Sequence, residues 1–243
     1  MNDDLITVAR VGLDGAAEAT GTVIVIDVLR AFTTAAFAFA AGAEAIIVVS
    51  GVEEAFALRQ ENPDWLIMGE KGGLPVDGFD LDNSPAGFIG LDLTGCTLIQ
   101  RTTSGTQGVV RSRRAHHLFA SSLCCARATV RAVESIRPRR VTMVITGSHA
   151  GGLRDEDLAC ADYLEDLIRG RTPEDQSVVE RVLTSRAARK FRDPAQPQFS
   201  PADLDCAVDI DRFAFAMQVR GQGGWRVMTP VSVHGRDGAA GPL

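Results

Sequence analysis

The chain has 243 residues, of which 45% are hydrophobic and 23% are charged, and its formal net charge is −6. An acidic chain has no net positive field to attract a phosphate backbone, so we expect no nucleic-acid partner. The longest apolar run, residues 32–43, is too short to span a bilayer, and the acidic start does not resemble a signal peptide. We therefore expect a cytoplasmic protein without a membrane partner.

The predicted elements of the first half alternate between apolar strands and helices. Strands are predicted at residues 22–26, 45–49, 65–68 and 97–100, where apolar and β-branched residues run together. One helix is predicted at residues 32–41, which Gly42 ends, and another at residues 52–61, which Asn62-Pro63 end.

The second half becomes richer in helices after residue 152. Strands are predicted at residues 118–120, 140–145 and 225–233, and helices at residues 123–136, 155–169 and from Thr172-Pro173 onward. Residues 186–201 are polar and contain proline, which indicates a linker or a helix-rich excursion. We assign residues 1–233 to a single α/β domain with an excursion at 153–215, and residues 234–243 to a flexible tail.

The alternation of strands and helices is typical of a three-layer α/β/α fold with a mostly parallel central sheet. Ligands of such folds bind beyond the carboxyl ends of the strands. Four predicted strands end in polar residues, which begin at Asp27, Glu70, Arg101 and Thr146. If the sheet is parallel, these residues lie along one edge, and we place the site there.

The loop after the third predicted strand contains a dense group of polar residues. Between its glycine and its proline it holds Asp80, Asp82, Asn83 and Ser84. Long loops in α/β proteins are often functional, and oxygens of this kind suit a hard cation or a polar ligand. A surface turn with side-chain capping explains the same residues equally well.

Asp27 and Arg30 flank the start of the first predicted helix. Asp27 is either an N-cap or a metal ligand or nucleophile. A strand followed by Asp resembles the opening of haloacid-dehalogenase-type phosphatases. That family has a second Asp two residues on, where this chain has Leu29, which argues against a phospho-aspartyl mechanism. Arg30 is either an ion-pair partner or a bidentate clamp on phosphate or sulfonate.

Two further groups have a structural and a functional interpretation. The hydroxyl-rich turn of residues 102–106 could cap a helix, or its N–H groups could hold an anion. Asp155, Glu156 and Asp157 could be partners of a helix dipole or, beside Ser148, ligands of a divalent cation. Of the four histidines, only His149 lies near the predicted edge.

Five blocks of sequence, in order, resemble the 2-phosphosulfolactate phosphatase family. They are residues 26–34 (IDVLRAFTT), 69–70 (GE), 78–85 (GFDLDNSP), 102–106 (TTSGT) and 156–161 (EDLACA). The resemblance implies a magnesium-dependent phosphomonoesterase that makes sulfolactate on the route to coenzyme M. It also implies a small anionic phosphate ester as the partner.

The resemblance and the converging strand ends together predict the site residues. Catalytic roles are expected for Asp27, Arg30, Glu70 and Asp80. The expected Mg²⁺ ligands are Glu70, Asp80, Glu156 and Asp157, with the cation screening phosphate oxygens and activating water. Substrate binding, with Arg101 on the second anionic group, is assigned to Asn83, Ser84, Arg101, Thr102, Thr103, Ser104, Gly105, Thr106 and Ser148.

The chain departs from the family pattern at Asp82, where Gly is usual, and at Ser104, where Asn is frequent. These departures leave the substrate open between 2-phosphosulfolactate and a related phosphorylated hydroxy acid. Two alternatives are a protein that binds an anionic metabolite without hydrolysing it, and a lyase or isomerase on the same scaffold. We expect a homo-oligomer from the size and class of the chain.

Overall fold

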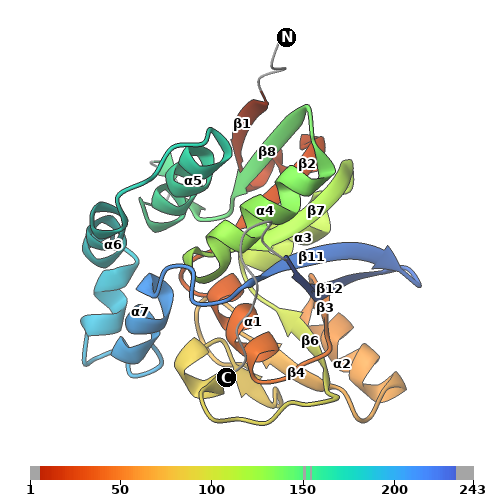
Figure 1. The fold of residues 1–243 in the computed structure, drawn as a ribbon. Coiled ribbons are helices and arrows are strands. Elements are labelled where there is room, and N and C mark those ends of the chain that lie inside the picture. Colours follow the sequence, from red (N-terminus) through yellow and green to blue (C-terminus); the bar gives the residue numbers. More distant parts are fainter. Residues whose placement is uncertain (1–5, 150–151, 154, 234–243) are drawn as a thin grey trace, which may run out of the picture.

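The computed structural model describes residues 6–149, 152–153 and 155–233, without the side chains of residues 148, 149, 152 and 153. Within these residues the chain forms an α/β fold around one large, curled, mostly parallel sheet (Figure 1). The predicted α/β class and mostly parallel sheet are confirmed. The three-layer arrangement stays a prediction.

The large sheet has ten strands in the order β1-β8-β2-β7-β11-β12-β3-β6-β4-β5. Their bounds are β1 Thr7–Gly12, β2 Gly21–Ile26, β3 Ala45–Val49, β4 Leu66–Gly69, β5 Leu81–Asp82, β6 Thr97–Arg101, β7 Ala115–Ser121, β8 Arg140–Ile145, β11 Phe215–Gln222 and β12 Trp225–Ser232. A separate two-stranded sheet pairs β9 Ser148–His149 with β10 Gly152–Leu153.

The helices follow the strands along most of the chain. The α-helices are α1 Ala31–Ala40, α2 Val52–Glu61, α3 Gly105–Arg111, α4 Ala126–Ile136, α5 Asp155–Ile168, α6 Asp175–Thr184 and α7 Pro201–Val208. The 3-10 helices are η1 Leu13–Glu18, η2 Pro85–Phe88, η3 Leu123–Cys125 and η4 Ala188–Arg192.

The large sheet consists of two parallel blocks that run in opposite directions. The first block is β1, β8, β2 and β7, and the second block is β3, β6, β4 and β5. The antiparallel hairpin of β11 and β12 lies between β7 and β3 and joins the blocks. Each step between neighbouring strands adds about 20–25° of twist. This rotation allows residues that follow β2, β4 and β6 to meet in one pocket.

Helices cover both faces of the central strand β2. Val23 and Val25 belong to the apolar cluster that includes residues of α1 and α3. Ile24 and Ile26 belong to a second cluster, which includes residues of α4 and α5. Because successive side chains of a strand point to opposite faces, β2 is packed on both sides and its carboxyl end is held firmly.

The predicted elements agree closely with the structure in most of the sheet. The bounds predicted for β3, β8 and α2 are confirmed, whereas α6 begins at Asp175 instead of Thr172 because Glu174 is an extended N-cap. The sequence interpretation missed β1 and β11 as well as the short strands β5, β9 and β10. The sequence contains a signal for β11, the pair Gly223-Gly224, which is typical of a tight hairpin turn. In the structure both glycines have positive φ in the turn between β11 and β12.

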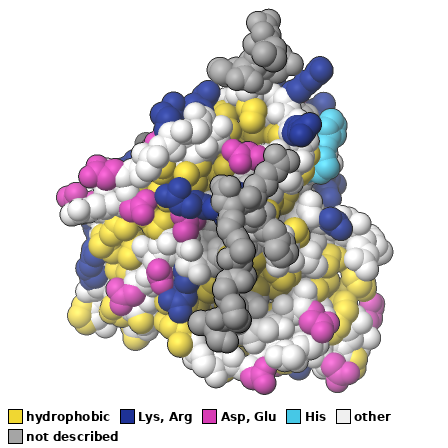
Figure 2. Space-filling view, viewed as in Figure 1, with side chains coloured by type: hydrophobic (Ala, Val, Ile, Leu, Met, Phe, Trp, Pro, Cys, Tyr) yellow, Lys and Arg dark blue, Asp and Glu magenta, His cyan; other side chains and the backbone are white. Residues whose placement is uncertain are grey.

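The domain assignment stays a prediction. The range 153–215 does contain α5, α6, η4 and α7, whereas the predicted tail at 234–243 lies outside the described residues. Figure 2 shows basic and acidic side chains interspersed with hydrophobic ones on one face of the molecule. Among the helices that the structure describes, none combines the length and the apolar character needed to cross a membrane.

Candidate active site

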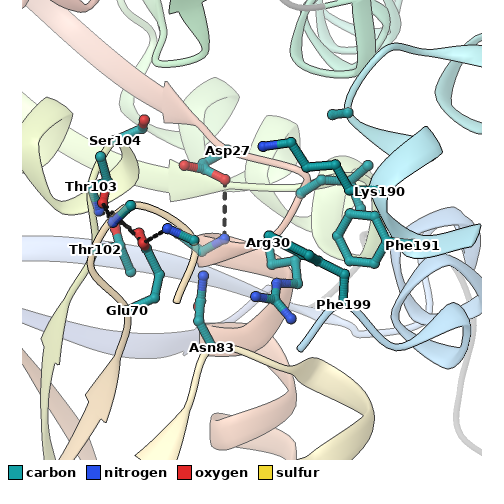
Figure 3. Close-up of a pocket in the computed structure, with 15 residues that line it drawn as sticks. Asp27, Arg30, Glu70, Asn83, Thr102, Thr103, Ser104, Lys190, Phe191 and Phe199 are labelled. Atoms are coloured by element: carbon teal, nitrogen blue, oxygen red, sulfur yellow. Dashed lines mark hydrogen bonds between the residues drawn. The ribbon is translucent and has the colours of Figure 1, made fainter. Parts of the chain in front are cut away.

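A pocket of about 290 Å³ lies beyond the carboxyl ends of β2, β4 and β6 (Figure 3). One wall comes from these strand ends, and η4 with Phe199 forms the other. The polar side chains that line it are Asp27, Arg30, Glu70, Asn83, Thr102, Thr103, Ser104 and Lys190. The pocket therefore combines carboxylates, cations and hydroxyls beside an aromatic surface.

Asp27 directly follows β2 and is only 6% exposed. Its Oδ1 accepts a hydrogen bond from the Ala31 N–H at 3.0 Å, and its Oδ2 accepts one from Thr146 Oγ1 at 3.1 Å. A Cβ at Gly105 would lie 3.0 Å from Asp27 Oδ2 and 2.6 Å from the Ala31 Cβ, so a larger residue does not fit there. These contacts fix the carboxylate at the pocket wall.

Glu70 directly follows β4 and fastens two loops together. Its Oε1 accepts a hydrogen bond from the Thr103 N–H, and its Oε2 accepts one from the Gly73 N–H. The Thr103 hydroxyl donates to Glu70 Oε2 at 2.9 Å and accepts from the Gly72 N–H at 2.7 Å. Glu70 thus holds the loop after β4 against the turn after β6.

Arg30 forms a buried ion pair with Asp203 of α7. The Nη1 atom of Arg30 lies 2.9 Å from Asp203 Oδ2, and the side chains are 5% and 0% exposed. The same Nη1 donates to the Gln198 carbonyl at 3.1 Å, and the guanidinium carbon lies 4.8 Å from the centre of the Phe199 ring. Asp203 also accepts the Ser84 hydroxyl at 2.6 Å. Asp203 therefore links Arg30 to the loop after β5.

Asn83 is buried in the same loop and lines the pocket. Its Oδ1 has no hydrogen-bond partner among the described residues. A buried amide oxygen without a partner costs free energy, so most such oxygens in proteins are satisfied by a donor or a cation. Asn83 thus places an amide oxygen without a partner among the described residues beside the pocket.

Two of the predicted residues, Asp80 and Arg101, lie outside the pocket lining. Asp80 forms an ion pair with Arg59 and accepts the Ile67 N–H at 2.7 Å. Desolvation acts to raise the pKa of Asp80, but these hydrogen bonds and the charge of Arg59 outweigh it, so the pKa is lowered. Arg101 donates to two backbone carbonyls, among them that of Glu70 at 2.7 Å. Both residues hold strand ends in place.

The acidic start of α5 also lies outside the pocket lining. Asp157 is buried, and its two oxygens accept the Val28 N–H at 2.7 Å and the Gly147 N–H at 3.1 Å. Glu156 is buried beside it. Within the described part of the chain, no three His, Cys, Asp or Glu side chains form a metal-binding group. The predicted set of Mg²⁺ ligands is therefore not brought together, and only Glu70 of that set lines the pocket.

The predicted substrate residues divide between the pocket and its support. Thr102, Thr103 and Ser104 line the pocket, whereas Gly105 and Thr106 lie behind it. Thr106 Oγ1 accepts the Thr102 N–H at 2.9 Å and the Thr106 N–H donates to Thr102 Oγ1 at 3.0 Å, which caps the start of α3. The side chains of Ser148 and His149 lie outside the described residues.

The sequence interpretation missed the wall that η4 provides. This wall consists of Ala187, Lys190 and Phe191 together with Phe199, from the segment described above as a linker or an excursion. Phe191 and Phe199 pack edge to face, with ring centres 5.2 Å apart. No spacing or motif in this polar segment indicates that it folds back onto strand ends more than 80 residues earlier in the chain.

Residues 9–199 match the 2-phosphosulpholactate phosphatase family. The chain belongs to this family. A relative from Bacillus subtilis (strain 168), named "Probable 2-phosphosulfolactate phosphatase", is 38% identical over 201 residues, or 82% of this chain and 87% of the relative. A relative of the same name from Caldicellulosiruptor saccharolyticus is 33% identical over 168 residues, which span 66% and 69% of the two chains. One from Carboxydothermus hydrogenoformans is 47% identical over 106 residues, or 44% of each chain.

Membership of the 2-phosphosulpholactate phosphatase family confirms the resemblance, and the name of the family is that of a phosphoric monoester hydrolase. The matched segment ends at Phe199, so it contains the described residues that line the pocket, whereas Asp203 lies beyond it. Of the two residues that depart from the family pattern, Ser104 lines the pocket. Asp82 does not, and its Oδ1 accepts the Ser84 N–H at 3.1 Å.

Proposed function

We propose that this chain hydrolyses 2-phosphosulfolactate to sulfolactate and phosphate in the pocket at the carboxyl ends of β2, β4 and β6. The observation that carries the proposal is the meeting of the Asp27 and Glu70 carboxylates with the Thr103 and Ser104 hydroxyls in one pocket of a chain of this family. Phosphoryl transfer depends on positioning and on charge neutralisation, and this pocket offers groups for both.

The proposal includes Mg²⁺ as the cofactor. Mg²⁺ is usually held by one or two carboxylates and completes its shell with water and phosphate oxygens. Glu70 supplies a carboxylate, and Asn83, next to it in the pocket lining, would supply an amide oxygen that has no other partner among the described residues. When bound, the cation would neutralise phosphate charge and lower the pKa of a bound water.

The roles of the other residues follow from their contacts. Asp27, oriented by the Ala31 N–H and the Thr146 hydroxyl, accepts a proton from the attacking water. The Ser104 hydroxyl donates to a phosphoryl oxygen. The Nη1 of Arg30 is bound to Asp203, and the other N–H groups of its guanidinium reach the phosphoryl group.

The decisive test is phosphate release from 2-phosphosulfolactate and from phospholactate, phosphoglycolate and 3-phosphoglycerate, each with Mg²⁺ and with EDTA. Release from 2-phosphosulfolactate that EDTA abolishes is the expected result. Release from another ester alone would support a phosphatase activity and replace 2-phosphosulfolactate as the proposed substrate. Lack of release from every ester by the folded protein would favour a protein that binds an anionic metabolite without hydrolysing it.

The Asn83→Ala variant tests the proposed cation ligands. We expect it to raise the Mg²⁺ concentration needed for half-maximal activity about tenfold. Ser84→Ala is the matched control, because the Ser84 hydroxyl is bound to Asp203 and its side chain does not line the pocket. An unchanged Mg²⁺ requirement in Asn83→Ala would remove Asn83 from the ligand set.

A further inference from the structure

The wall that η4 adds to the pocket contains a cation whose position suggests a role in substrate choice. Ala188 and Phe191 are buried and anchor the short helix, whereas Lys190 is exposed and lines the pocket. Its Nζ lies 5.4 Å from the centre of the Phe199 ring. Figure 3 shows the amine end of the Lys190 side chain directed toward the side where Asp27 lies.

The two cations among the described lining residues have different surroundings. Arg30 is buried, and its Nη1 is bound to the Asp203 carboxylate. Lys190 has no carboxylate within ion-pair distance in the part of the chain that the structure describes. A flexible, hydrated ammonium group of this kind can follow an anionic group of a ligand without losing a partner inside the protein.

The positions of the walls separate the two ends of a bound ester. The strand-end wall carries the carboxylates of Asp27 and Glu70 and the Ser104 hydroxyl, where the phosphoryl group is expected. Lys190 belongs to the opposite wall, together with Phe191 and Phe199. In the view of Figure 3, Ser104 and Lys190 lie on opposite sides of Asp27.

We propose that Lys190 binds one of the two non-reacting anionic groups of the substrate, its carboxylate or its sulfonate, and so selects phosphate esters that carry a further acid group over esters that carry none. This inference rests on the proposed function. A contact made equally in the bound substrate and in the transition state lowers KM and leaves kcat unchanged. One acid group besides the phosphate would thus be recognised by η4, not by Arg101, whose guanidinium is bound to backbone carbonyls.

The test compares phosphate release from 2-phosphosulfolactate and from isopropyl phosphate, a secondary ester without a second acid group. For Lys190→Gln we expect KM for 2-phosphosulfolactate to rise about tenfold, with kcat unchanged. In Lys190→Arg, which keeps the positive charge, KM should stay close to that of the wild-type protein. The kinetics with isopropyl phosphate should not change. Arg189→Gln removes an exposed cation from the same helix that does not line the pocket, and it should leave both esters unaffected.

An equal loss for both esters in Lys190→Gln, or no loss for either, would overturn the inference. If the wild-type protein releases phosphate from neither ester, the proposed function fails, and calorimetric binding of 2-phosphosulfolactate becomes the test. Weaker binding to Lys190→Gln than to Arg189→Gln would then support the role of Lys190. Equal dissociation constants in these two variants would overturn it.

Discussion

The two parallel blocks of the sheet each provide one carboxylate to the pocket, and they hold it differently. Asp27, after β2, accepts the Ala31 N–H and a hydroxyl, that of Thr146, which also bonds to the Ile26 carbonyl. Glu70, after β4, accepts two backbone N–H groups and the Thr103 hydroxyl. A hydroxyl can rotate to accept a bond, whereas a backbone N–H cannot. Loss of the negative charge should therefore lower the stability of the fold less at Asp27 than at Glu70, although both residues directly follow a strand.

The largest expected effect is that of Asp27→Asn on activity. Because the new amide can donate to the Thr146 hydroxyl, which can then donate to the Ile26 carbonyl, the fold should tolerate the change. Loss of the proton acceptor should lower kcat about a thousandfold. Phosphate release and thermal unfolding measured on the same preparation give both quantities. Full activity in this variant would exclude Asp27 from the chemistry.

The buried pair of Arg30 and Asp203 connects the two blocks, since Asp203 also binds Ser84 after β5. Asp203→Ala leaves a buried guanidinium without its carboxylate and should lower the free energy of unfolding by about 3 kcal/mol. Chemical denaturation measures this change. The double variant Asp203→Ala with Arg30→Met should lose less free energy of unfolding than the two single variants lose together. Additive costs would show that the pair does not act as a unit.

Glu70→Gln should destabilise the fold more than Asp27→Asn does. Its amide N–H₂ group must face the N–H of either Thr103 or Gly73, and neither can accept a hydrogen bond. We expect the free energy of unfolding to fall by about 2 kcal/mol. Denaturation curves of the two variants provide the comparison. Equal stability of both would contradict the difference drawn between the two blocks.

The smallest expected effect is that of Asp80→Asn, which lies outside the pocket. Solvent screens the pair with Arg59, so the free energy of unfolding should fall by only about 0.5 kcal/mol, and kcat should not change. Because the pKa of Asp80 is lowered in the fold, this contribution is present above the ordinary Asp pKa of about 3.9 and is lost as pH falls through the lower folded value. Denaturation at pH 7 and pH 3 checks the sign, and a large loss of kcat would place Asp80 in the site after all.

Several of the residues predicted for the site line one pocket, whereas the roles predicted for them stay predictions. Strand ends could be read from local apolar runs, and Asp27, Glu70 and Asn83 were found because polar residues follow those runs. Asp80 and Asp157 carry the same type of signal, yet their partners are Arg59 and the Val28 N–H. An isolated carboxylate in a sequence does not reveal whether a guanidinium, a backbone N–H or a ligand will lie beside it.

The sequence by itself determined the α/β class, the bounds of β3, β8 and α2, and the family. These follow from side-chain periodicity and from contiguous motifs, which are local properties of the chain. Only the tertiary structure decided that the hairpin of β11 and β12 lies between two opposed parallel blocks, and that Lys190 and Phe191 face the strand ends. Both depend on packing between segments far apart in the chain, because strand pairing and helix docking are selected by the buried surface that they share.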